Sequence, residues 1–254
     1  MDIVLLYTTI FVFLIAFAFS MVGQGGGSMY SPLLILLGYA VSISTSTSLV
    51  LTLITSLSAG YVFYRKKMID FRTSFLFIPG VCLGAFMGGA LVAFVDETFL
   101  LWLFVFFLAG LGGRMVYTFW ERGKIEDEFP ECIVTTMYPP IVLFSFGVGL
   151  ISGLLGIGGG VLIVPFIIYI CKHPTKFAAG SSHVIVSFSA FSGLLGYAAF
   201  RAFDIPLILV TGIAVLIGGN LGARTSMRIE AQKIRAGLGI AVWVIAVMIL
   251  MRIF

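Results

Sequence analysis

Residues 20–32 read SMVGQGGGSMYSP, and residues 153–165 read GLLGIGGGVLIVP. Both stretches contain Gly-x-Gly-Gly-Gly, followed after four residues by a proline, and both lie in strongly apolar surroundings. Because a glycine inside a helix costs about 1 kcal/mol relative to alanine, four glycines in five positions predict a break in the helix. The chain therefore breaks its backbone twice in the same way, at Gly23 and at Gly156, 133 residues apart.

The composition around these breaks indicates a membrane protein. Of the 254 residues, 60% are hydrophobic and 10% are charged, whereas a soluble domain carries roughly 25% charged residues. Apolar runs of about 20 residues, the length of a membrane-spanning helix, recur along nearly the whole chain. We therefore expect an all-α polytopic membrane protein.

The charged residues and the cysteines exclude other classes of protein. The net charge of +4 comes from basic residues in a few short loops, which suits anionic lipid and does not indicate nucleic-acid binding. Cys82, Cys132 and Cys171 lack the spacing of a metal or redox site, so we expect no disulfide framework, metal or cofactor. No carboxylate lies deep in a predicted span, and no side-chain pair is placed for acid–base or nucleophilic chemistry. We expect no catalytic residues and no enzymatic activity.

Hydropathy divides the chain into two repeats of similar plan. The first repeat, residues 1–119, has predicted helices at 3–21, 28–39, 42–64, 71–95 and 98–120. The second repeat, residues 137–254, has predicted helices at 137–155, 161–171, 177–200, 205–226 and 234–254. Each repeat is thus a broken-helix hairpin followed by three spans, which gives eight to ten membrane segments. Residues 120–136 form a polar linker.

The two repeats also match at positions outside the glycine stretches. The matching positions are Gly84/Gly88 with Gly218/Gly222, Asp70 with Asp204, and Thr47/Ser48 with Ser181/Ser182. Glycines four residues apart let helices approach closely in lipid. We interpret these glycine pairs as helix-packing positions.

The distribution of charge predicts the orientation of the repeats. Loops rich in Lys and Arg stay in the cytoplasm, and the basic loops are residues 65–72 in the first repeat and 224–235 in the second. These two loops do not correspond to each other in the repeat, so the repeats are predicted to be inverted. Both termini then lie outside, the linker lies in the cytoplasm, and each hairpin has a glycine stretch at its tip.

Inverted repeats with paired broken helices are typical of a transporter whose site lies near the membrane midplane. Each return helix is predicted to begin at the glycines, so its free N–H groups and its positive dipole end face the tip. Glycines let such N–H groups converge on an anion. The alternatives are that the glycines only permit close helix crossing, or that the first return helix begins at Ser31-Pro32.

Polar residues near the tips complete the predicted site. Gln24 lies in the first tip and either contacts the substrate or caps a carbonyl group. His183, the one titratable side chain placed well inside a span, is a candidate to gate, to carry a proton or to bind the anion, or it is structural. The predicted substrate-binding residues are Gly23, Gln24, Gly25, Gly26, Gly27, Thr47, Ser48, Gly156, Gly158, Gly159, Gly160, Ser181, Ser182 and His183.

These glycine–proline motifs, the hydroxyl-rich spans after them and the Gly-x-x-x-Gly helices resemble the sulfite exporter TauE/SafE family, over essentially the whole chain. The second motif, Gly153 to Pro165, is closer to the family pattern, because Gln24 replaces an apolar residue in the first. The resemblance implies a permease of the cell inner membrane for sulfite, sulfonates or related organosulfur anions. The alternatives are a transporter of another small anion such as a carboxylate, an enzyme acting on lipid phosphate, and a non-transporting scaffold. A homodimer is left open.

Overall fold

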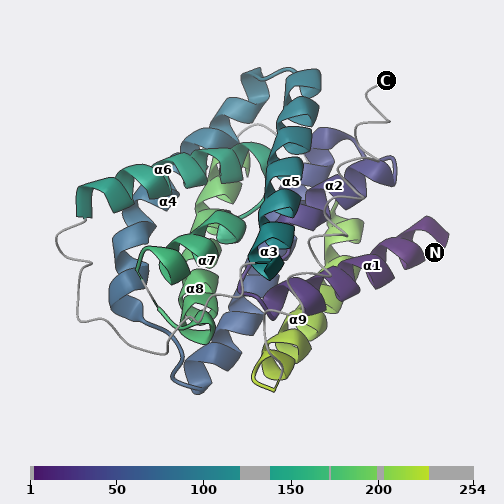
Figure 1. The fold of residues 1–254 in the computed structure, drawn as a ribbon. Coiled ribbons are helices and arrows are strands. Elements are labelled where there is room, and N and C mark those ends of the chain that lie inside the picture. The colour runs from purple at the N-terminus through teal and green to yellow at the C-terminus, as the bar shows by residue number, and fades with distance from the viewer. Residues whose placement is uncertain (1–2, 121–137, 172, 199–202, 229–254) are drawn as a thin grey trace.

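The computed structural model describes residues 3–120, 138–171, 173–198 and 203–228, and these residues contain helices and no strands (Figure 1). The helices of the first repeat are α1 (Ile3–Ser20), α2 (Gly27–Leu36), α3 (Val41–Arg65), α4 (Phe71–Leu91), the 3₁₀ turn η1 (Val92–Phe94) and α5 (Glu97–Trp120). Those of the second repeat are α6 (Tyr138–Leu155), α7 (Gly160–Tyr169), α8 (Thr175–Ala198) and α9 (Ile205–Ser226).

Every predicted helix within the described residues is present, which confirms the all-α prediction. Among these residues, α3, α4, α8 and α9 are long and apolar enough to cross a membrane. The predicted helix at 71–95 is shorter than expected, since α4 ends at Leu91 and a 3₁₀ turn follows. The last predicted helix, 234–254, and the linker after Trp120 lie outside the described residues.

The helices α4 and α9 begin in the same way. Asp70 caps α4 by accepting a hydrogen bond from the N–H of Arg72 at 3.0 Å. Asp204, the matching residue, caps α9 by accepting from the N–H of Leu207 at 3.0 Å. An N-cap carboxylate satisfies an N–H group that has no partner inside the helix. The matching aspartates therefore have the same structural role in the two halves.

Helices of one half pack against those of the other. In Figure 1, α6 crosses α4 and α1 crosses α9, and these pairs are in extensive contact. A methyl group at Gly84 would overlap the carbonyl oxygen of Phe146, and one at Gly222 would overlap that of Phe17. Glycine is thus required where the helix backbones touch, as expected for packing positions.

The helices α3 and α8 form the centre of the molecule. In their most apolar 18-residue windows, 67% of α3 and 61% of α8 is buried, against 44% in both α4 and α9. The helix α4 packs on α8 while its counterpart α9 packs on α3, and α2 packs on α3 while α7 packs on α8. The pairs α4–α8 and α9–α3 join the two halves, whereas α2–α3 and α7–α8 each lie within one half. Each pair has its counterpart in the other half, as in a twofold arrangement. The opposite orientation of the halves in a membrane stays a prediction.

Candidate functional site

Each glycine stretch forms a turn between two helices, α1 and α2 in the first half and α6 and α7 in the second. Gly26 and Gly159 precede α2 and α7 directly, with φ angles of 83° and 76°. This left-handed conformation suits glycine because it has no Cβ atom. Both return helices begin at the glycines, so the alternative start at Ser31-Pro32 is wrong, and Pro32 lies inside α2.

The tips leave backbone N–H groups free. The first bonds of α2 run from the N–H groups of Met29 and Tyr30 to Gly26 O, at 3.0 and 3.1 Å. In α7, the N–H groups of residues 162 and 163 donate to Gly159 O at 3.1 and 3.2 Å. Within the described chain, the N–H groups of residues 25–28 and 158–161 have no hydrogen-bond acceptor. A helix start with buried, unpaired donors is suited to bind an anion.

The two tips touch each other. A methyl group at Gly27 would overlap the carbonyl oxygen of Ile157. Gly160, the residue that matches Gly27, lies against Gln24, where an added Cβ would be 2.9 Å from the carbonyl oxygen. The start of each return helix therefore contacts the second residue of the opposite tip. The fold brings together glycines that are far apart in the sequence.

Two predicted serines hold the tips in place. The Ser48 hydroxyl on α3 donates to Gly156 O at 2.7 Å and shares its proton with Gly27 O at 3.2 Å. The Ser182 hydroxyl on α8 donates to Gly23 O. Gly156 O and Gly23 O lie at helix breaks, where no intrahelical donor is available, whereas Gly27 is the first residue of α2. Ser48 and Ser182 are matching residues, and each fixes the tip of the other half.

The sequence analysis missed two hydroxyl residues on α3. A Cβ at Gly25 would lie 2.6 Å from Ser56 Oγ, and one at Gly158 would lie 2.5 Å from Thr52 Cγ2. Thr52 therefore packs against both tips. Thr52 and Ser56 follow Ser48 at intervals of four residues, which places all three on one helix face. That spacing was the signal in the sequence that could have identified them.

Several buried polar atoms near the tips have no protein partner. They are Gln24 Oε1, Ser28 Oγ, Thr47 Oγ1, Thr52 Oγ1, Ser56 Oγ and His183 Nδ1. Leaving a buried polar group without a partner costs about 1–3 kcal/mol, so native proteins normally pair such groups with protein, water or ligand. The Gln24 Oε1 atom can only accept a hydrogen bond, and among the described residues the Gln24 side chain forms no hydrogen bond to a carbonyl group. The cluster adds polar side chains to the free N–H groups.

His183 is only half satisfied. Its Nε2 atom lies 3.0 Å from the carbonyl oxygen of Ser20 at the end of α1. A carbonyl group only accepts, so Nε2 carries the hydrogen and, in the neutral ring, Nδ1 is an acceptor. The ring packs beside Phe63, with centroids 5.6 Å apart. His183 thus supports the first tip through one nitrogen and keeps the other unpaired.

Ser181 and Thr47 differ in their surroundings although they are matching residues. The Ser181 hydroxyl accepts the N–H of Asp70 at 2.9 Å, so it supports the start of α4. Thr47 is fully buried, and its hydroxyl has no partner. Of the predicted polar residues, Ser48 and Ser182 hydrogen-bond to the tips, and His183 bonds to Ser20, the last residue of α1. Ser181 instead accepts from Asp70, before α4.

A lateral groove of about 330 Å³ leads toward the tips. Its inner lining includes Ser56 and His183, and its outer lining includes Leu57, Tyr61 and Tyr64. The outer three side chains are 57–58% exposed. The groove therefore joins the apolar outer surface to two side chains with unpaired polar atoms.

A second polar cluster lies at the starts of α4 and α8. An ion pair joins His173 Nε2 and Asp70 Oδ2 at 2.9 Å. The hydrogen bond from His173 holds the pKa of Asp70 well below its usual range, and the same bond raises the pKa of His173. The described residues contain no group of three or more His, Cys, Asp or Glu side chains that could hold a metal ion.

Comparisons with known proteins agree with the fold. A family model described as "Sulfite exporter TauE/SafE" matches residues 8–249. A probable membrane transporter protein of Xylella fastidiosa is 28% identical over 248 residues, covering 94% of this chain and 92% of that protein. A probable membrane transporter protein of Methanocaldococcus jannaschii is 26% identical, covering 88% of this chain and 86% of that protein.

The probable membrane transporter protein YunE of Bacillus subtilis is 24% identical over 237 residues, covering 85% of this chain and 86% of its own. No solved structure matches the chain. The family match spans nearly the whole sequence, and the described residues include four helices able to cross a membrane. The chain belongs to the sulfite exporter TauE/SafE family of membrane transporters.

Proposed function

We propose that this protein is a secondary transporter that moves a small sulfur-containing oxyanion, such as sulfite or a sulfonate, across the cell inner membrane. The observation that carries this proposal is the pair of touching tips, whose N–H groups at 25–28 and 158–161 have no acceptor among the described residues. The family name supports the sulfur oxyanion. The inverted repeats and external termini expected from the sequence are part of the same proposal.

The chemistry of the tips suits an anion without any basic side chain. An anion taken from water must replace its hydration shell with other donors. Two helix starts supply N–H groups and positive dipole ends, and the unpaired hydroxyl groups of Ser28, Thr52 and Ser56 can supply more. A pyramidal SO₃ group presents oxygens in three directions and can accept from both tips, whereas carboxylate oxygens lie in one plane. This favours sulfite or a sulfonate over a carboxylate.

The described conformation is closed around the tips. Residues 20–32 and 152–161 are buried, and the contacts at Gly27 and Gly160 leave no room for a methyl group. Transport therefore requires the tips to separate, and in inverted-repeat transporters one repeat moves against the other around the site. We infer that α4 packed on α6 forms one moving unit and that α9 packed on α1 forms the other.

Purified protein in liposomes tests the proposal. The wild type is expected to take up ³⁵S-labelled sulfite or a sulfonate, with competition by unlabelled sulfur oxyanions and weaker competition by carboxylates. Thr52→Val removes the hydroxyl that lies between the tips while keeping the shape of the side chain. We expect the variant to lower flux at least tenfold, which corresponds to about 1.4 kcal/mol.

The matched control is Thr211→Val. Thr211 is also fully buried, but its hydroxyl donates to Leu207 O in its own helix. This variant is expected to keep wild-type flux. Equal flux in both variants would remove the tips from the transport site. Stronger competition by a carboxylate than by sulfite would assign the protein to the alternative substrate class.

A labelling experiment tests the orientation separately. A cysteine in place of Lys66 should react only with a reagent applied from the cytoplasm, and one in place of Phe203 only with a reagent applied from outside. These positions lie in matching loops of the two repeats. Labelling of both from the same side would contradict the inverted arrangement and leave the substrate proposal to the flux assay.

A further inference from the structure

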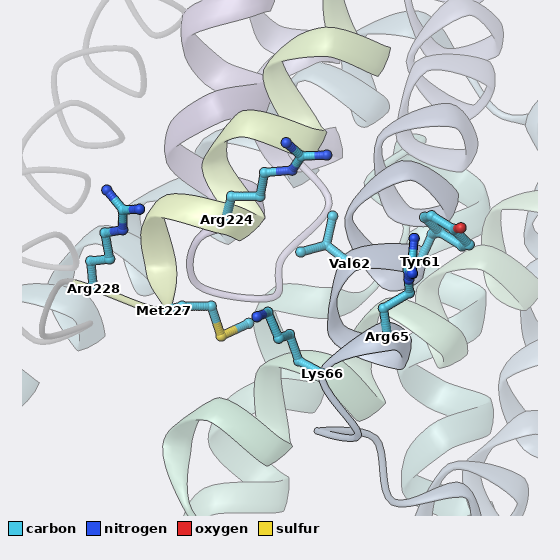
Figure 2. A pocket seen from close by; sticks show the side chains of 7 residues that line it. All are labelled: Tyr61, Val62, Arg65, Lys66, Arg224, Met227 and Arg228. Atoms are coloured by element: carbon cyan, nitrogen blue, oxygen red, sulfur yellow. The ribbon is translucent and has the colours of Figure 1, made fainter.

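A second pocket lies away from the tips, where α3 and α9 end side by side (Figure 2). Its volume is about 530 Å³, within the range of roughly 300–1,000 Å³ for small-molecule sites. The lining side chains are Tyr61, Val62, Arg65, Lys66, Arg224, Met227 and Arg228. One wall comes from each half of the chain.

The lining is strongly basic. Arg65, Lys66, Arg224 and Arg228 border the pocket, and none of the described residues that line it is Asp or Glu. Across the described part of the chain, none of these four cations forms an ion pair with a carboxylate, and Arg65 packs over the Tyr61 ring at 5.9 Å. Like charges gathered around a concave surface repel each other and concentrate anions. The pocket therefore has the charge of an anion site.

Helix dipoles explain only part of this arrangement. Cations near the C-terminal ends of α3 and α9 interact favourably with the negative ends of those helices. The carbonyl group of Met227, just after α9, is already bonded by Lys176 Nζ at 3.2 Å. The dipoles do not require cations from both helices to face one hollow, as they do in Figure 2.

The pocket lies at the edge of the lipid-facing surface. On the side toward the membrane centre, α3 exposes Leu57 and Tyr61, and α9 exposes Leu216 and Leu221. Tyrosine and basic residues are typical of the membrane–water interface, and basic pockets between membrane helices on the cytoplasmic side bind anionic headgroups. We propose that this pocket binds the phosphate group of an anionic phospholipid and so joins the ends of α3 and α9.

The buried side of the pocket is apolar, which favours a bound lipid over a passage for the substrate to the tips. Val62 belongs to a buried apolar cluster with Phe63, Ala179 and Ala223, and Met227 packs against that cluster. Ala179 in turn lies directly against Gly23 of the first tip. An apolar layer therefore separates the basic pocket from the glycines, and the proposal does not depend on the transported substrate.

The test measures lipid binding by the full-length protein in a neutral detergent. Bound lipids are counted by native mass spectrometry during titration with short-chain phosphatidylglycerol or phosphatidylcholine. The wild type is expected to bind phosphatidylglycerol more tightly. Each cation near a membrane surface contributes about fivefold in affinity, so the double variant Lys66→Gln/Arg224→Gln should weaken phosphatidylglycerol binding about 30-fold. The single variant Arg228→Gln should weaken it about fivefold and covers the case in which the double variant misfolds.

Lys67→Gln is the matched control, because Lys67 is adjacent to Lys66 but does not line the pocket. It should change the affinity for phosphatidylglycerol by no more than about twofold, as an exposed charge does. Inorganic phosphate forms the second arm. If it binds with the same dependence on Lys66 and Arg224 while the two lipids bind equally, the pocket takes a soluble phosphate and the lipid proposal fails. Equal losses in Lys66→Gln and Lys67→Gln, or no preference between the lipids, also overturn it.

Discussion

Replacing Ser48 by alanine removes the side-chain hydrogen bond by which, within the described residues, α3 holds the second tip. The hydroxyl proton serves Gly156 O at 2.7 Å and Gly27 O at 3.2 Å, so the substitution leaves buried carbonyl groups of both tips without this donor. Gly156 O lies at the break and has no donor inside a regular helix, whereas Gly27 is the first residue of α2. The substitution therefore tests whether the tips are held by named side chains.

The loss of unfolding free energy in Ser48→Ala can be estimated from the burial of the hydrogen bond. Hydrogen bonds between membrane helices contribute about 0.6 kcal/mol on average and about 1.7 kcal/mol at most, whereas an unpaired buried group costs about 1–3 kcal/mol. Because Ser48 is fully buried and Gly156 O has no other donor among the described residues, we expect a value near the overlap of these ranges, about 1.5 kcal/mol. The free energy of unfolding is measured by reversible denaturant titration of the protein in mixed micelles.

Ser46→Ala is the control for this measurement. Ser46 lies on the same helix and is equally buried, but its hydroxyl donates to Ile43 O within its own helix at 3.1 Å. We expect this change to cost no more than about 0.5 kcal/mol. If Ser46→Ala and Ser48→Ala lower the free energy of unfolding by the same amount, the reasoning about the tip is refuted.

Three further predictions concern other contacts. Gly27→Ala should destabilise the protein by about 1–3 kcal/mol, because the methyl group meets Ile157 O. Gly60→Ala should be tolerated, since the atom nearest to the added methyl group would be 3.6 Å away. Equal unfolding temperatures for the two variants would contradict the packing at the tips. His183→Gln should unfold at a higher temperature than His183→Ala, because the amide can still donate to Ser20 O; equal unfolding temperatures would show that this bond contributes nothing. The ion pair of His173 with Asp70 should make stability fall as pH rises through the raised pKa of His173, since a raised folded-state pKa stabilises only while the ring is protonated. Below the ordinary aspartate pKa of about 3.9, the contribution of Asp70 is lost as well, because its pKa is lowered in the folded state. Thermal unfolding of the wild type and of His173→Gln across pH should converge at the alkaline end, and parallel curves would exclude the pair.

The sequence predicted the helices and the tips well because both depend on local patterns. Runs of apolar residues predicted each described helix, and four glycines in five positions predicted the break before Gly27 and Gly160. The matching Asp70 and Asp204 were aligned from the sequence, and both cap helices in the structure. Each of these features is determined by a few residues that are neighbours in the sequence.

The remaining features depend on contacts between distant segments. Thr52 was missed because its importance comes from Gly158, which lies on the other half of the chain. Ser181 is adjacent to Ser182 and was predicted with it, yet its hydroxyl bonds to Asp70 and not to a tip. Successive residues of a helix point in different directions. The basic pocket requires the ends of α3 and α9 to meet, and neither loop alone predicts that.

The transported anion is proposed to bind to the backbone N–H groups of the two tips. Selenite has the shape and charge of sulfite, and selenium scatters X-rays anomalously, so a structure of the protein with selenite locates the anion directly. We predict an anomalous peak between residues 24–27 and 157–160, with oxygens about 3 Å from the free N–H groups. A peak elsewhere in a protein that transports selenite, with the tips still in direct contact, would contradict binding of the anion by the tips.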